Sequence, residues 1–178
     1  MAGNADGKGM VQVYTGEGKG KTTAALGLAV RAAGWGQRVL IVQFLKGRDT
    51  GELHSLTRLK PEIEIVQVGS PGFVRTCEER ADEAGRTHRG LALAQLAVTG
   101  GKYQLVILDE VLVAISLGLL SLDEVLSLVH TKPESVELVL TGRGAPPEIV
   151  AEADLVTCMK EVKHPYQRGI EARQGVDY

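Results

Sequence analysis

The sequence of residues 15–23 is Thr15-Gly16-Glu17-Gly18-Lys19-Gly20-Lys21-Thr22-Thr23. Residues 10–14, which precede this stretch, alternate between apolar and polar side chains and predict a short strand. The run from Lys21 to Arg31 predicts a helix that Gly34 or Gly36 ends. In a glycine-rich loop between a strand and a helix, successive backbone N–H groups face one centre, and the helix N-terminus adds partial positive charge. Residues 15–23 therefore predict a phosphate-binding loop; a glycine-rich turn that contains Gly-Lys-Thr by chance is the alternative.

The loop carries the two side chains that such a site needs. Lys21 can reach phosphate oxygens, and the hydroxyl of Thr22 can coordinate Mg²⁺. The standard motif has one more residue between its first glycine and the Gly-Lys pair than the three that Gly16 and Gly20 enclose. Thr15 thus stands where the standard motif has its first glycine. We expect a tighter cradle that holds the phosphates differently from the loop of an ordinary NTPase.

A pair of carboxylates follows a second predicted strand. Residues 105–108 form an apolar run that predicts a buried strand, and Asp109-Glu110 come directly after it. In nucleotide sites a carboxylate in this position holds Mg²⁺. Asp109 is expected to bind the ion directly or through water, and Glu110 to coordinate it or to polarise a water. The alternative is that one of the two only caps the following helix. No Asn-Lys-x-Asp motif follows, which argues against a GTPase.

Strands and helices alternate along the rest of the chain. The apolar runs that predict further strands are 38–44, 63–68, 136–141 and 154–162. Helices are expected at 76–98, from 121 onward and at 146–152, the first two beginning with capping boxes at Thr76 and Ser121. Continuous apolar strands that alternate with helices indicate a parallel sheet covered on both faces. The predicted fold class is α/β: a doubly wound, mostly parallel sheet in a three-layer sandwich of the P-loop NTPase-like, RecA-type kind.

The composition excludes several classes of protein. The 178 residues suit one domain, residues 10–178, preceded by a flexible tail of small and polar residues, 1–9. An apolar content of 44% and a charged content of 24% exclude wholesale disorder. The net charge of −2 gives no indication of nucleic acid or of a membrane surface as partner. The most apolar stretch, 111–120, has ten residues, fewer than the ~20 that span a bilayer.

The cysteines and the N-terminus indicate a protein of the reducing cytoplasm. Cys77 and Cys158 have no metal-ligand spacing and are too few for a disulfide scaffold, so both are interpreted as small hydrophobic residues. The N-terminus lacks the apolar core of a signal peptide. The four histidines are dispersed and are expected to be structural or on the surface, His164 being the one nearest to a recognisable motif.

Motifs outside the loop extend the interpretation to a family. They are the runs 39–47, 105–110, Leu140-Thr141-Gly142-Arg143, Val162-Lys163-His164-Pro165-Tyr166 and the C-terminal Gly175-Val176-Asp177-Tyr178. Together with the shortened loop they resemble the ATP:corrinoid adenosyltransferases of the CobA/CobO/BtuR type, from about Met10 to Tyr178. The short loop belongs to the pattern of that family.

The resemblance implies a transferase rather than a phosphotransferase. A corrinoid reduced to Co(I), such as cob(I)yrinic acid a,c-diamide, attacks the 5′ carbon of ATP, forms a Co–C bond and expels tripolyphosphate, in cobalamin biosynthesis or salvage. The implied co-substrate is ATP with Mg²⁺, and the implied partners are a second copy of the chain and an electron-donating reductase. Because the corrinoid is the nucleophile, no nucleophilic side chain is required.

The resemblance also assigns residues to this reaction. Lys21, Thr22 and Glu110 are expected to be catalytic, and Thr22, Asp109 and Glu110 to hold Mg²⁺. The residues expected to bind ATP are Gly16, Glu17, Gly18, Lys19, Gly20, Lys21, Thr22, Thr23, Arg31 and Arg143. Arg31 follows Thr22 by nine residues, about 13 Å along a helix, and is as readily interpreted as a solvated arginine. For Arg143 the alternative is a salt bridge to Glu110 or Asp109.

The corrinoid side departs from the family pattern. Relatives carry Gly-Phe-x-Trp before the charged helix, whereas this chain reads Gly72-Phe73-Val74-Arg75. The chain keeps the phenylalanine of this pattern and has Arg75 in place of the tryptophan. Phe73 is expected to contact the corrinoid, with a place in the core as the alternative.

Two other functions stay open: a P-loop phosphotransferase or NTPase, and a module that senses ATP without turnover.

Overall fold

The structure is a computed structural model that describes residues 7–72 and 76–177. Its first half contains β1 (Val11–Thr15), α1 (Lys21–Gly34), β2 (Val39–Gln43), α2 (Gly51–Leu56), η1 (Thr57–Leu59), β3 (Ile63–Gln67) and α3 (Cys77–Thr99). Its second half contains β4 (Leu105–Asp109), α4 (Val111–Ser116), α5 (Leu122–Thr131), β5 (Glu137–Thr141), α6 (Pro147–Glu152), β6 (Leu155–Cys158) and η2 (Pro165–Arg168).

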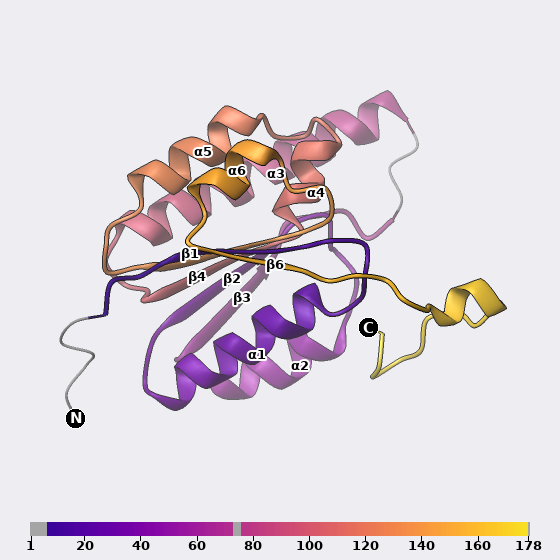
Figure 1. Cartoon of the computed structure of the whole chain (residues 1–178), viewed down its shortest axis with the longest axis horizontal. Coiled ribbons are helices and arrows are strands. Elements are labelled where there is room, and N and C mark those ends of the chain that lie inside the picture. The colour runs from indigo at the N-terminus through magenta and orange to yellow at the C-terminus, as the bar shows by residue number, and fades with distance from the viewer. Residues whose placement is uncertain (1–6, 73–75, 178) are drawn as a thin grey trace.

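The strands form one six-stranded sheet in the order β3-β2-β4-β5-β1-β6, and every pair in it is parallel. Figure 1 shows α1 and α2 on one face of this sheet and α3 to α6 on the other. Alternate residues of a strand enter different cores: Leu40 and Val42 pack under α3 to α6, whereas Val39 and Ile41 pack against α1. This confirms the predicted fold class, an α/β sheet covered on both faces.

The predicted capping boxes are both present. The Thr76 hydroxyl accepts a hydrogen bond from the Glu79 backbone N–H, and the Glu79 carboxylate accepts one from the Thr76 N–H. Ser121 and Glu124 make the same reciprocal pair at the start of α5. Each pair satisfies backbone groups that a helix start leaves without partners.

Two of the predictions about local structure were wrong. The predicted strand 154–162 stops at Cys158, because the chain then turns beneath the phosphate loop, where the Met159 oxygen accepts a hydrogen bond from the Gly18 N–H at 2.7 Å. Both cysteines are exposed rather than packed as small hydrophobic residues. Cys158 ends an edge strand whose residues are all exposed, and Cys77 opens α3.

Of the predicted tail, residues 7–9 lie in the described part of the chain. Gly9 is buried, its N–H faces the Glu134 oxygen, and its own oxygen accepts a hydrogen bond from Lys132 at 2.8 Å.

In the described ranges no helix is both long and apolar enough to cross a membrane.

The strand order places the candidate site. The loop after β1 and the carboxylates Asp109 and Glu110 at the end of β4 lie at the same edge of the sheet, with only β5 between the two strands. Parallel α/β sheets bind ligands at this edge, outside the carboxyl ends of the strands.

Candidate active site

The phosphate loop joins β1 to the first residue of α1, Lys21. Gly16 has a φ of 96° and Gly20, the N-cap residue of α1, a φ of 118°, a conformation that residues with a side chain rarely adopt. The loop also lies close to the chain that follows β6. A Cβ atom at Gly16 would stand 2.5 Å from the Met159 oxygen, and one at Gly18 would stand 2.8 Å from it. Gly16 is therefore needed both for the turn and for its close packing, Gly20 for the turn, and Gly18 for the close packing.

Lys21 is folded into the loop. Its ammonium donates hydrogen bonds to the carbonyl oxygens of Gly16 at 2.6 Å and Gly18 at 2.8 Å, and only 7% of the residue is exposed. Burial lowers the pKa of Lys21 below its ordinary value, and the nearby Glu110 carboxylate opposes that shift. A partly desolvated cation at the centre of the loop is placed to bind an anion held by the same loop.

Asp109 is the most connected side chain of the site. It is 1% exposed, and its Oδ1 atom accepts hydrogen bonds from the hydroxyls of Thr22 and Thr141, each at 2.8 Å. Its Oδ2 atom accepts from Lys46 Nζ at 2.7 Å and from Gln43 Nε2 at 3.1 Å. These contacts tie the carboxyl ends of β4, β5 and β2 to the first turn of α1. They exclude the alternative that Asp109 only caps a helix.

Glu110 lies beside this carboxylate in an unusual backbone conformation. Its φ is 63°, and its backbone N–H donates to the Thr141 hydroxyl at 2.9 Å. Glu110 is the N-cap residue of α4, but its side chain makes no capping hydrogen bond. Burial, and then the charge of Asp109, raise the pKa of the Glu110 carboxyl. The side chain lines the cavity described below, so it is directed to the site rather than to the helix.

A metal ion fits this donor set if a nucleotide supplies further ligands. No group of three or more His, Cys, Asp or Glu side chains in the described part of the chain could hold a metal on its own. Mg²⁺ is bound by oxygen atoms, typically of one or two carboxylates together with phosphates and water. The Thr22 hydroxyl and the Asp109 carboxylate lie 2.8 Å apart at the mouth of the loop, and Glu110 is next to them.

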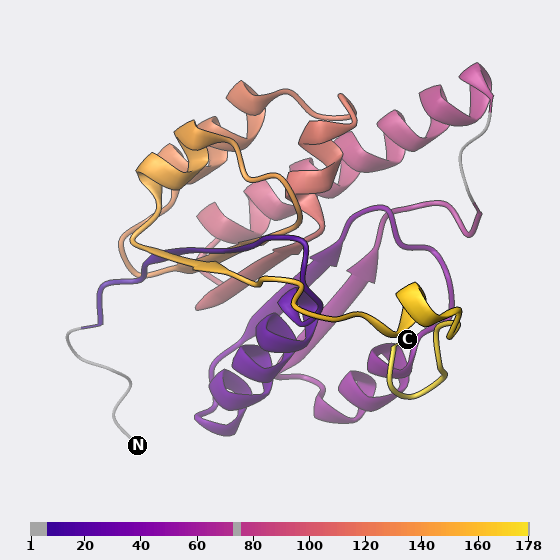
Figure 2. The ribbon, with the colours of Figure 1, turned by 45° about the vertical axis from the view of Figure 1, so that its right-hand side comes forward.

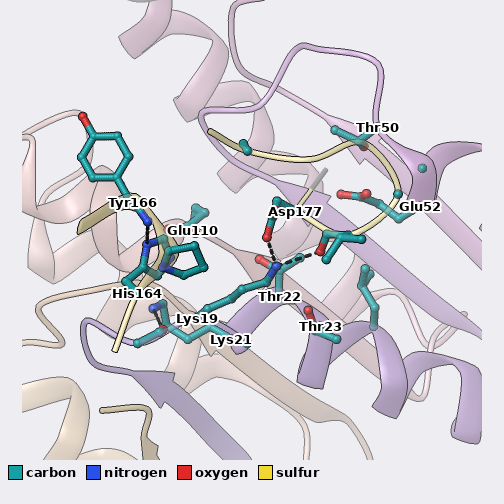
Figure 3. Close-up of a pocket in the computed structure, with 18 of the residues that line it drawn as sticks. Lys19, Lys21, Thr22, Thr23, Thr50, Glu52, Glu110, His164, Tyr166 and Asp177 are labelled. Carbon is teal, nitrogen blue, oxygen red and sulfur yellow. Dashed lines mark hydrogen bonds and ion pairs between the residues drawn. The ribbon is translucent and has the colours of Figure 1, made fainter. Parts of the chain in front are cut away.

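A cavity of about 780 Å³ opens above the loop. Its floor is residues 17–23, one wall is the start of α2 (residues 50–52), and another is formed by Glu110 and Arg143. The fourth side is the C-terminal segment, which contributes His164, Tyr166 and Asp177 to the lining; Figure 3 shows Asp177 facing Lys19. Figure 2 shows this segment leaving β6 and crossing toward α2.

The C-terminal segment is bound to the loop through Lys19. The Lys19 ammonium donates to the Val176 carbonyl at 2.8 Å and forms an ion pair with Asp177, which also pairs with Arg173. The hydrogen bond from Lys19, and then those from Arg173, hold the pKa of Asp177 well below its ordinary value. His164 belongs to this wall, where its Nδ1 atom accepts a hydrogen bond from the Tyr166 N–H at 3.3 Å.

The structure brings most of the predicted residues together. Glu17 to Thr23, Glu110 and Arg143 line the cavity, and Gly16 and Asp109 lie directly behind it. Arg143 forms an ion pair with Glu17 at 3.1 Å rather than the alternative pair with Asp109 or Glu110. Arg31 does not line the cavity: it lies exposed in the last turn of α1. Phe73 lies outside the described residues.

No role was predicted from the sequence for Gln43, Lys46, Glu52 or Thr141. Gln43 ends β2, Lys46 follows it, and Thr141 ends β5. A systematic inspection of polar residues at every strand end could have found these three, because all such ends meet at one edge of a parallel sheet. Glu52, which accepts a hydrogen bond from Gln43 at 3.1 Å, comes from α2 and gives no such signal.

The fold and the site define a P-loop nucleotide-binding protein. Among solved structures the chain is similar to the KaiC-like protein PH0186 of Pyrococcus horikoshii, with a TM-score of 0.58 and 17% identity, over 88% of this chain and 75% of that one. At this identity the likeness shows the fold alone.

Sequence comparison identifies the family. Residues 7–178 match the family described as ATP:corrinoid adenosyltransferase BtuR/CobO/CobP. A corrinoid adenosyltransferase of Pseudomonas aeruginosa is 36% identical over 97% of this chain and 85% of its own length. One of Escherichia coli K12 is 34% identical over 97% of this chain and 87% of its own. The chain therefore belongs to the ATP:corrinoid adenosyltransferase family, a family of transferases, which confirms the resemblance found in the sequence.

Proposed function

We propose that this protein transfers the 5′-deoxyadenosyl group of MgATP to the Co(I) centre of a reduced corrinoid and releases tripolyphosphate. The observation that carries the proposal is the cavity above a shortened phosphate loop, lined by Lys21, Thr22 and Glu110, with Asp109 bonded to Thr22 directly behind it. Family membership supplies the identity of the two substrates.

The chemistry places specific demands on the protein. The electron pair of Co(I) forms the Co–C bond to C5′, while the C5′–O bond breaks and its electrons leave with the triphosphate. Negative charge therefore grows on the leaving group as the reaction proceeds. The loop N–H groups and Lys21 stabilise that charge, since fixed donors directed at developing charge are among the strongest sources of catalysis. Thr22, Asp109 and Glu110 would hold Mg²⁺, which adds further positive charge at the phosphates.

The remaining residues of the cavity bind and orient ATP in this proposal. Lys19 and Arg143 are cations at its edge, each held by an ion pair with a carboxylate of the chain, Asp177 and Glu17. The corrinoid, and not a side chain, is the nucleophile. The protein's part in this step is therefore to hold C5′ in line with the incoming cobalt. Phe73 as a corrinoid contact and Arg31 as an ATP contact stay predictions. A cytoplasmic homodimer that receives electrons from a reductase completes the proposal.

One experiment tests the reaction directly. The protein is incubated with ATP, Mg²⁺ and a chemically reduced corrinoid while the visible spectrum and the phosphate products are followed. We expect a light-sensitive alkylcobalt spectrum together with one equivalent of tripolyphosphate per cobalt. Release of orthophosphate or ADP without the spectral change would instead identify an NTPase or phosphotransferase. ATP binding without any product would identify a sensing module.

A methyl group at Gly18 tests the shortened loop. Its Cβ would lie 2.8 Å from backbone atoms of both Met159 and Lys160, so the loop has to shift. We expect Gly18→Ala to weaken MgATP binding by about tenfold to 100-fold, since a displacement of about 1 Å in a binding group has effects of this size. Isothermal titration calorimetry measures the affinity.

Gly27→Ala is the matched control for this variant. Gly27 lies within α1, where an added Cβ meets nothing within 4 Å. Alanine at this position is expected to leave ATP binding unchanged and to raise the free energy of unfolding by up to about 1 kcal/mol. Equal ATP affinities of the two variants would contradict the close-packed loop.

A further inference from the structure

Lys46 is held in place by strained and closely packed backbone. The residue before it, Leu45, has a φ of 58°, which a residue with a side chain rarely adopts outside functional sites. The Lys46 carbonyl accepts a hydrogen bond from the Gly69 N–H at 2.9 Å, and a Cβ at Gly69 would stand 2.3 Å from the Lys46 nitrogen. The loops after β2 and β3 therefore fix the point from which the Lys46 side chain enters the site.

The Lys46 ammonium borders the pair of residues that suits Mg²⁺. It lies 2.7 Å from Asp109 Oδ2, 3.4 Å from Thr22 Oγ1 and 4.0 Å from Glu52 Oε1. Its side chain is 26% exposed and lines the cavity above the phosphate loop. A lysine in this position is thus a cation at the same carboxylate that a metal ion would use.

Two cations compete for one carboxylate because each lowers the attraction that the other experiences. Mg²⁺ bound by Thr22 and Asp109 would repel the Lys46 ammonium from Asp109. The flexible stem of lysine lets the ammonium move to another anion within reach. The triphosphate of ATP, bound in the cavity that Lys46 lines, is such an anion.

We propose that Lys46 is a further ATP-binding residue, which neutralises Asp109 until Mg²⁺ arrives and then binds the triphosphate. The inference rests on the proposed function, since it needs MgATP in this cavity. It gives the leaving group a second cation beside Lys21, supplied by the loop after β2 instead of by the phosphate loop. The competing explanation is a purely structural lysine that pairs with Asp109 under all conditions.

Dependence on Mg²⁺ separates the two explanations. ATP binding is measured by calorimetry without corrinoid, once with Mg²⁺ and once with EDTA, for the wild type and Lys46→Met. We expect the variant to bind ATP at least about tenfold more weakly with Mg²⁺, the size of effect expected when a hydrogen bond to a charged group is lost. With EDTA the ammonium stays on Asp109, and the loss should be smaller than about threefold.

The control variants are Lys46→Arg and Lys8→Met. Arginine keeps the charge and should retain most of the MgATP affinity, and Lys8 is an exposed lysine paired with Glu134. Lys46→Gln, whose amide can still donate to Asp109, replaces Lys46→Met if the latter does not fold. Equal losses with Mg²⁺ and with EDTA, or no loss at all, would overturn the role of Lys46 and leave the proposed function standing. Failure of the wild type to bind MgATP would overturn both.

Discussion

Lys21→Ala is expected to lower the rate of adenosyl transfer by about 10³-fold, the upper end of the range for removal of one donor that stabilises transition-state charge. Lys21 is the buried cation of the loop and hydrogen-bonds two of its carbonyl groups, so its charge is held at the loop that is proposed to bind the phosphates. In the proposed reaction the departing tripolyphosphate gains charge in the transition state. The loss should therefore affect kcat more strongly than the KM for ATP.

The measurement is the initial rate of alkylcobalt formation at saturating MgATP. Lys102→Ala is the matched control, because Lys102 pairs with Glu64 on the surface and does not line the cavity. Thermal unfolding of both variants shows whether the protein still folds when the substitution leaves two loop carbonyl groups without their donor. A folded Lys21→Ala variant with activity close to that of the wild type would refute the assignment of the phosphate loop.

The order of strands and helices was predictable because the local signals agree with one another. Apolar runs gave β2 and β4, and the capping boxes at Thr76 and Ser121 gave the starts of α3 and α5 to within one residue. The helix α2 was not predicted, and α4 was expected only as the helix that Asp109 or Glu110 would cap. Each has six residues, too few for a periodic pattern to show, and neither begins with the proline that marks the equally short α6. The end of β6 was missed because packing under the phosphate loop, and not a local breaker, ends that strand.

The candidate site was predictable where one segment contains both the residue and its context. Lys21 and Thr22 follow a glycine loop, and Asp109 ends an apolar strand, so each carries its own signal. The role of Lys46 depends on Asp109, which lies 63 residues away along the chain. The ion pair between Lys19 and Asp177 spans 158 residues. The tertiary fold determines which residues such side chains contact, and no local sequence pattern predicts these contacts.

Asp109→Asn is expected to impair both the fold and the reaction, because this carboxylate accepts four hydrogen bonds while almost fully buried. Two donors face each of its oxygens, so the amide nitrogen of asparagine has to face a pair of donors whichever way it turns. The Lys46 ammonium also loses the nearer of its two carboxylate partners, but it is 26% exposed and water replaces part of that interaction. The expected loss in the free energy of unfolding is about 2 kcal/mol, from buried groups left without partners.

The effect on the reaction follows from the same carboxylate. If Asp109 holds Mg²⁺ with Thr22, the asparagine variant should need a higher Mg²⁺ concentration for half-maximal rate and should turn over at least about 10²-fold more slowly. Asp82→Asn, an exposed change within α3, is the matched control and should alter stability by less than about 0.5 kcal/mol. A folded Asp109→Asn variant with the Mg²⁺ dependence of the wild type would mean that Asp109 organises Thr22, Thr141 and Lys46 but does not hold the metal ion.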